Sequence, residues 1–259
     1  MTIVLADGRR AKAPLLIGAD GRNSTIRRLA GIAVDTHDHG QSALTFTIHH
    51  SLPHGGRAEE HFSPDGVLAI LPLPGERSSI VWAVAPGEAA RLKALPADAF
   101  RAALQQRIGR HLGEITVEGA VNLYPLHLQI AQSMTADRIA LVGDAAHVIH
   151  PLAGLGLNLG FKDVAALAEC VDDAMARGED HGSALVLERY ARWRRFDVAS
   201  TVVAMEGMNR LFANANPFLA PLRKAGLLLV NKMPQAKAVI MTEAAGTSGT
   251  VPRLMRGLR

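Results

Sequence analysis

The sequence is poor in cysteine, in aromatic residues and in long apolar runs. Only one of its 259 residues is cysteine and 4% are aromatic, whereas 48% are hydrophobic. The single Cys170 excludes an internal disulfide and fits a reducing compartment, and the aliphatic composition predicts a globular core. No apolar run approaches the roughly 18 residues that span a bilayer. No signal peptide is expected, because Met1 leads directly into a strand-like segment.

The charge of the chain is only mildly basic, with 28 basic and 24 acidic residues and a net charge of +4. Aromatic and basic residues do not interleave, and no helix-turn-helix pattern is present. These features argue against a nucleic-acid partner. The length allows one or two domains.

Turn-forming residues divide the chain into short strands followed by long helices. A hairpin is predicted from strands over 1–6 and 13–19 around Asp7-Gly8-Arg9, and then a short helix capped by Asn23 or Ser24. An antiparallel sheet with one buried face is predicted from strands over 41–50, 57–63, 67–73 and 78–84. The later elements expected are a helix over 97–112, strands over 115–123 and 139–142, and helices over 155–177 and 183–213.

The segment from Arg138 to Asn158 carries the strongest signal of a ligand site. It consists of a buried strand, then Gly143 and Asp144 at the strand's carboxyl end, and then a Pro/Gly turn that opens a long helix. Strand-end carboxylates beside helix N-termini are where α/β proteins hold cofactors. Asp144 is therefore expected to accept hydrogen bonds from sugar-like hydroxyls. The alternative is an aspartate that only caps a turn.

Two motifs resemble the FAD-dependent aromatic hydroxylases of the para-hydroxybenzoate hydroxylase superfamily. Residues 143–158 are similar to its second flavin-binding motif. Residues 18–24, with Arg27, are similar to its Asp-Gly motif, which lies near the FAD pyrophosphate and assists NAD(P)H use. Further segments resemble the ubiquinone-biosynthesis (UbiH-like) hydroxylases within it: 150–154, 159–164, 194–197, 209–212 and 252–257.

The resemblance implies an α/β fold, α+β overall, built on an incomplete FAD/NAD(P)-binding Rossmann-like domain. An antiparallel substrate sheet is inserted into that domain, and helices close the chain. The implied divisions are a partial FAD-binding domain over 1–36, a substrate domain over 37–125, further FAD-binding chain over 126–180 and a helical region over 181–259.

The activity that the resemblance implies is hydroxylation of a polyprenylated phenol in ubiquinone biosynthesis. FAD is the implied cofactor, NAD(P)H the reductant, and O₂ adds to the reduced flavin as a C4a-hydroperoxide. A different phenolic substrate is the alternative. A cytoplasmic location, a ubiquinone-biosynthesis complex and contact with the inner membrane are also implied. Apolar and basic residues over 217–241 fit either that membrane contact or a helix packed on its own domain.

The cofactor-binding residues that the resemblance implies lie in the two motifs. They are Asp20, Gly21, Arg27, Gly143, Asp144, Pro151, Gly154, Gly156, Leu157 and Asn158. Pro72 and His150 are expected on the substrate side, and no catalytic acid or base is predicted.

The charged and histidine side chains near the motifs have simpler alternatives. No metal is expected at His147 and His150, because they lack cysteine or carboxylate partners at ligand spacing. Strand and loop positions scatter the histidines at 37, 39, 49, 50, 54 and 61, where a metal site is the alternative to solvated side chains. His147 and His150 are expected to pack and to bond backbone groups. Arg27 is expected either to pair with phosphate or Asp20, or to be a solvated helix arginine.

Two features depart from the family pattern. Leu155 stands where the subfamily has glutamine, which predicts altered flavin tuning more than altered flavin binding. The Gly-x-Gly-x-x-Gly unit that holds the ADP half of FAD does not occur, so the strands over 13–19 and 138–143 are expected to lack their central partner and to expose apolar surface. A fragment, a mistaken start and a remnant are the open explanations. A non-catalytic lipid-binding or complex-forming subunit is the alternative function.

Overall fold

The computed structural model describes residues 1–151, 154–212, 233–235, 238, 241–242 and 249–258. These residues form two compact units. Unit 1 contains Met1–His37, Leu128–Met208 and the described C-terminal residues. Unit 2 contains Asp38–His127 and, among the described residues, 209–212 at the end of the chain's last long helix. Most of the expected membrane-contact segment, 217–241, lies outside the described residues.

Unit 1 begins with a hairpin that differs from the predicted one. Its strands are β1 (Thr2–Val4) and β2 (Arg10–Lys12), paired in register from Thr2↔Lys12 to Val4↔Arg10. The predicted second strand, 13–19, was wrong as a hairpin partner. The turn closes early, because the N–H of Leu5 donates to the carbonyl of Arg9, and Pro14 has no N–H for the ladder.

The strand after Pro14 joins a different sheet of unit 1. Strand β3 (Leu16–Gly18) runs parallel to β10 (Ile139–Leu141), and β9 (Thr135–Ala136) pairs antiparallel on the other side of β10. These two parallel strands were expected to lack a central partner strand. They pair directly with each other, and β3 forms the edge of this sheet. The expected apolar exposure is confirmed at Ile17, which is 47% exposed. A short turn, η1 (Gly143–Ala145), and β11 (His147–Val148) follow β10, and β11 pairs with Gln129–Ile130.

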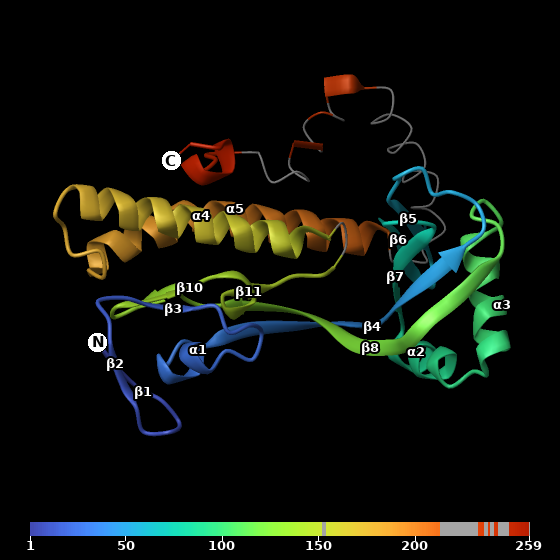
Figure 1. The fold of residues 1–259 in the computed structure, drawn as a ribbon, viewed down its shortest axis with the longest axis horizontal. Helices are drawn as coiled ribbons and strands as arrows, with labels where there is room; N and C mark the ends of the chain where they lie inside the picture. Colours follow the sequence, from blue (N-terminus) through green and yellow to red (C-terminus); the bar gives the residue numbers. More distant parts are fainter. Residues whose placement is uncertain (152–153, 213–232, 236–237, 239–240, 243–248, 259) are drawn as a thin grey trace. The chain divides into compact units, whose positions relative to one another are not determined.

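Three helices complete unit 1, and the two long ones lie side by side (Figure 1). They are α4 (Leu155–Ala176) and α5 (Ala184–Phe212), and their buried faces pack with β10 around Tyr190. The Tyr190 hydroxyl donates to the carbonyl of Leu141 at 2.7 Å. The short α1 (Thr25–Leu29) is capped by Ser24, as predicted, through a 2.9 Å bond from the N–H of Arg27. A 3₁₀ turn, η3 (Arg253–Arg256), lies near the C-terminus.

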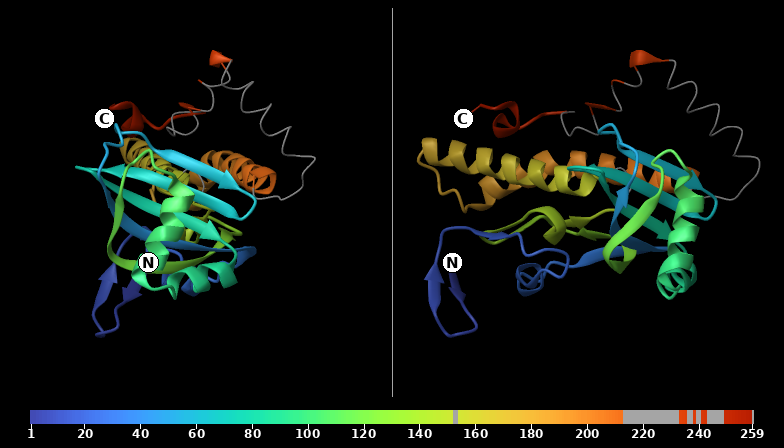
Figure 2. Two further views of the ribbon diagram at one scale, coloured as in Figure 1. Left: turned by 90° about the vertical axis from the view of Figure 1, so that its right-hand side faces the viewer. Right: turned by 45° about the vertical axis from the view of Figure 1, so that its right-hand side comes forward.

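Unit 2 is an antiparallel sheet with helices on one face (Figure 2). Its strands are β4 (Val34–His50), β5 (Glu59–Ser63), β6 (Gly66–Leu73), β7 (Arg77–Val84) and β8 (Ile115–Ala131). The hydrogen-bonded order is β8-β4-β7-β6-β5, and β4 and β8 also contribute residues to unit 1. The predicted strands are confirmed, although β4 and β8 are longer than expected.

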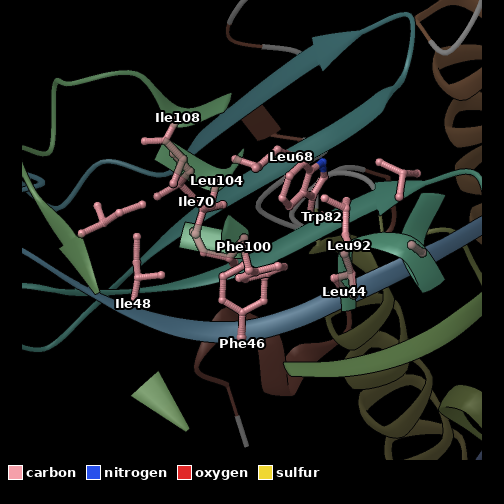
Figure 3. Close-up of a cluster of buried hydrophobic side chains, with 14 of the residues drawn as sticks. Leu44, Phe46, Ile48, Leu68, Ile70, Trp82, Leu92, Phe100, Leu104 and Ile108 are labelled. Carbon is pink, nitrogen blue, oxygen red and sulfur yellow. The ribbon is translucent and has the colours of Figure 1, made fainter. Parts of the chain in front are cut away.

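The helices of unit 2 are α2 (Pro86–Lys93), which was not predicted, and α3 (Ala97–Ile108). Alternating strand side chains and the buried face of α3 form its core (Figure 3). The ring of Phe100 lies 5.2 Å from Phe46 and 6.3 Å from Trp82, between centroids. None of the helices in the described part of the chain has the length and hydropathy that crossing a membrane requires.

Candidate functional site

A cavity of about 470 Å³ in unit 1 brings the two sequence motifs together. The carboxyl ends of β3 and β10 are adjacent because the strands are parallel neighbours, and such strand ends are common ligand sites. The N-terminal half of α4 forms the other wall. The lining residues are Ala19, Gly21, Val142, Gly143, Asp144, Gly156, Leu157, Gly160, Phe161 and Val164.

Gly143 turns the chain sharply at the end of β10. Its φ of 58° lies in the left-handed region that favours glycine. Helix α4 contacts this turn backbone to backbone, because a Cβ on Gly160 would lie only 3.2 Å from the Cα of Gly143. The spacing between turn and helix therefore depends on glycine at 160.

Asp144 presents its carboxylate to the cavity. The residue is exposed, lines the cavity and makes no hydrogen bond or ion pair with the described residues. The alternative of an ordinary cap is wrong, since Val142 holds the N-cap position of η1. The carboxylate oxygens are thus available to accept hydrogen bonds from ligand hydroxyls.

Asp20 has a different position from Asp144. Its carboxylate accepts hydrogen bonds from the Ser24 hydroxyl and from the backbone N–H of Thr25, at 2.7 Å, and of Ile26, at 3.1 Å. Burial by itself raises the pKa of Asp20, but these hydrogen bonds together hold the pKa below its ordinary value. Asp20 therefore helps Ser24, the N-cap residue, to cap the first turn of α1. The adjacent Gly21 lines the cavity and has a φ of 78°.

Arg27 links the two motifs through hydrogen bonds and does not line the cavity. It is 5% exposed, so the alternative of a solvated arginine is wrong. Its two Nη atoms donate to the carbonyls of Ala145, at 2.7 Å, and Arg22, at 2.9 Å. A contact between Arg27 and phosphate stays a prediction.

Helix α4 points its N-terminus at this region. Gly154 occupies the N-cap with a φ of 63°, and none of the described side chains caps the first turn of α4, so the N–H groups of that turn are available to a ligand. Leu155, which replaces the family's glutamine, is 7% exposed and packs in the interior instead of lining the cavity. Gly156 and Leu157, two of the residues predicted to bind the cofactor, line the cavity.

The remaining predicted residues lie outside the lining of this cavity. Pro151 is exposed, Asn158 is half-buried and His150 is buried at the end of the same segment. Residues 152–153 lie outside the described part of the chain. Pro72 lies on β6 in unit 2, paired in register with Ser78. Their roles toward a ligand stay predictions.

A buried cluster of charged side chains lies behind the Gly143 turn. The Asp163 carboxylate accepts bonds from the N–H of Gly143 at 2.9 Å, from Nε2 of His147 at 2.6 Å and from Nε of Arg194 at 2.7 Å. Arg194 also donates to Asp197 at 2.6 Å. The expectation that His147 bonds backbone groups was wrong, because its partner is a side-chain carboxylate.

Sequence reasoning gave Asp163 and Arg194 no role in the site. A signal was present, because Asp163 falls at helical spacing among residues of the buried face of α4. That face includes Leu159, Asp163, Ala166, Cys170 and Ala174. An acidic residue on an apolar helical face predicts a buried partner.

The geometry fits a flavin bound through its ribityl chain and ring. Glycines 143, 156 and 160 let backbone approach a ligand without Cβ contacts, and Asp144 offers an acceptor to hydroxyls. The N-terminus of α4 offers partial positive charge to an electron-rich ring. Leu157 and Phe161 add exposed apolar surface.

Two curated relatives named as ubiquinone-pathway hydroxylases match the chain. The ubiquinone hydroxylase UbiL of Rhodospirillum rubrum is 42% identical over 261 residues, covering 100% of this chain and 61% of the relative. The 3-demethoxyubiquinol 3-hydroxylase of Escherichia coli is 34% identical, covering 93% of this chain and 62% of the relative. The chain thus spans about three fifths of the length of these relatives.

Solved structures with the same fold, and a family match, complete the comparison. The p-nitrophenol 4-monooxygenase PnpA of Pseudomonas putida has a TM-score of 0.77 at 21% identity, over 97% of this chain and 64% of that chain. This likeness confirms the predicted α/β fold class. Residues 4–205 match the FAD binding domain family. Because that match extends over more than half of its length, the chain belongs to the FAD binding domain family.

Proposed function

We propose that this chain holds the flavin half of FAD in an FAD-dependent, NAD(P)H-using monooxygenase of the UbiH-like type. The substrate proposed is a polyprenylated phenol of ubiquinone biosynthesis. The observation that carries the proposal is the cavity in which Gly21, Gly143 and Asp144 meet the N-terminus of α4. The names of the two curated relatives support the pathway.

Different residues of the cavity would contact different parts of the cofactor. Asp144 would accept hydrogen bonds from the ribityl hydroxyls, and the N–H groups that begin α4 would stabilise negative charge on the reduced ring. Leu157 and Phe161 would cover part of the ring and exclude water from it. When bound, the flavin supplies the oxygen chemistry of the hydroxylation.

The other predicted residues take their places around this arrangement. Asp20, Gly21 and Arg27 would lie toward the FAD pyrophosphate, and Pro151, Gly154, Gly156 and Asn158 would surround the ring. Pro72 and His150 would lie on the substrate side. Unit 1 would correspond to the FAD-binding divisions and C-terminal helices, and unit 2 to the substrate domain. A ubiquinone-biosynthesis complex and peripheral contact with the inner membrane belong to the same proposal.

The first experiment asks whether the chain retains flavin. Purified protein is mixed with excess FAD and freed of unbound FAD on a desalting column, and its visible spectrum is recorded. We expect flavin to be retained, and Asp144→Ala to weaken the affinity about tenfold through loss of charge-assisted hydrogen bonds. Asp137→Ala, an exposed aspartate in the turn between β9 and β10, serves as the matched control.

A second candidate is a non-catalytic lipid-binding or complex-forming subunit. No retained flavin in the wild-type chain would support that candidate. If flavin is retained, NADH consumption with polyprenylated and soluble phenols separates the proposed substrate from a soluble one.

A further inference from the structure

The N–H of Gly143 has an acceptor that the strand pairing does not supply. The last ladder bond between β10 and β3 runs from the N–H of Val142 to the carbonyl of Gly18, at 3.0 Å. The chain then turns at Gly143, and its N–H points to the Asp163 carboxylate at 2.9 Å. Asp163 thus replaces a strand as the partner of the first residue of the turn.

The Asp163 carboxylate is fully buried and is held from both sides. Arg194, also fully buried, donates to Oδ1 at 2.7 Å, while His147 bonds Oδ2 at 2.6 Å. Arg194 is itself held by Asp197 at 2.6 Å, and Lys162 lies 3.5 Å from the same Asp197 carboxylate. Two carboxylates, of Asp163 and Asp197, thus face two cationic side chains, of Arg194 and Lys162.

Stability alone does not account for this buried cluster. Replacing buried ion pairs with apolar side chains of similar volume is often neutral or stabilising. An apolar side chain at 163, however, would leave the N–H of the half-buried Gly143 without its acceptor. The feature that specifically needs the carboxylate is therefore the Gly143 turn.

We propose that Asp163 is a positioning residue, which fixes Gly143 so that Asp144 faces the cavity, and that Arg194 and His147 hold its carboxylate in place. This inference rests on the proposed function for its consequence on flavin. The inference goes beyond the proposed function because it assigns the orientation of Asp144 to Asp163, a side chain that does not line the cavity. The chain of contacts runs from α5 through Arg194 and Asp163 to the ligand-facing turn.

The test is Asp163→Asn, because asparagine keeps the volume but has only one oxygen. If Arg194 takes that oxygen, the amide NH₂ faces the N–H of Gly143 and the bond is lost. In the chain without FAD, we expect hydrogen exchange of the Gly143 amide to accelerate at least about tenfold. The amides of Ala140 and Leu141 should keep their rates. Asp180→Asn is the matched control, since Asp180 also pairs with an arginine, Arg138, in unit 1.

Two results of the exchange experiment would overturn the inference. One is an unchanged exchange rate at Gly143, and the other is an equal acceleration at Ala140 and Leu141, which would mean a general loss of stability. If Asp163→Asn does not fold, Arg194→Lys keeps the charge but loses the Nε bond, and the same localised effect on Gly143 is expected.

The FAD titration separates this inference from the proposed function. We expect Asp163→Asn to bind FAD about tenfold more weakly than the wild type. A wild-type chain that retains no FAD would contradict the proposed function, while the exchange of Gly143 would still decide the positioning role. Equal FAD affinity despite a loosened Gly143 would overturn the role of Asp163 and leave the proposed function standing.

Discussion

The guanidinium of Arg27 donates a 2.7 Å hydrogen bond to the carbonyl of Ala145, across 118 residues of sequence. Ala145 lies next to Asp144, and Arg27 belongs to the helix that Asp20 caps. One buried side chain therefore joins the two motifs that were separate in the sequence. Its second bond, to the carbonyl of Arg22, holds the chain that leads into that helix.

Replacing Arg27 with methionine should loosen both motifs. Methionine keeps the apolar stem, but the buried carbonyl of Ala145 loses its donor from Arg27. The carbonyl of Arg22 keeps only the bond from Nε2 of Gln129, at 2.9 Å. We expect the free energy of unfolding in urea to fall by roughly 1 to 3 kcal/mol. Arg28→Met is the control, because Arg28 is exposed and bonds only the Thr25 hydroxyl. Equal losses in both variants would contradict the structural role of Arg27.

Replacing Gly160 with alanine should destabilise the chain although alanine is the better helix former. The added Cβ would lie 3.2 Å from the Cα of Gly143, and that turn is tied down by Asp163. We expect a loss of about 1 kcal/mol in the free energy of unfolding from overpacking. Gly207→Ala in α5 meets nothing within 4 Å and should instead gain about 0.5 to 1 kcal/mol. A gain in both variants would show that the turn yields to the Cβ.

The capping carboxylate of Asp20 should contribute stability that depends on pH. Its folded pKa lies below the ordinary value of 3.8 because hydrogen bonds favour the charged form. Such a contribution is fully present above the unfolded pKa and is lost as pH falls through the folded pKa. We expect the stability difference between wild type and Asp20→Asn to be largest near neutral pH and to shrink below about pH 4.

Urea denaturation across that range measures this difference. Asp137→Asn, at the turn between β9 and β10, provides the comparison. A difference that grows as the solution becomes more acidic would contradict the capping role of Asp20.

The thiol of Cys170 should be unreactive in the folded chain. It lies in the core of unit 1, and burial raises its pKa to about 11, with Asp173 and Glu169 adding to the shift and Arg189 opposing it. At pH 8 only about one thousandth of such a thiol is thiolate. We expect slow labelling by a disulfide reagent in buffer and complete labelling in urea. Rapid labelling of the native chain would place Cys170 at the surface.

The sequence predicted most elements because each is encoded locally. Alternation in 67–73 and 78–84 and helical spacing in 155–177 survive in β6, β7 and α4 with small changes at the ends. Ser24 as a cap and Gly143 as a turn follow from local geometry in the same way. Strand pairing depends on residues that are distant in the sequence. The predicted hairpin partner of β1 was therefore 13–19, whereas the partner in the structure is β2.

The site shows the same division. The residue types and order in 143–158 were enough to single out Asp144 and the glycines at the start of α4, which the structure places in one cavity lining. Contact between Asp144 and a ligand stays a prediction. Only the tertiary structure decided that Leu155 packs inside and that Arg27 and Asp163 hold the turn at Gly143–Ala145 through hydrogen bonds. The physical reason is that a buried charge takes its role from its partners, and packing chooses those partners from residues far away in the sequence.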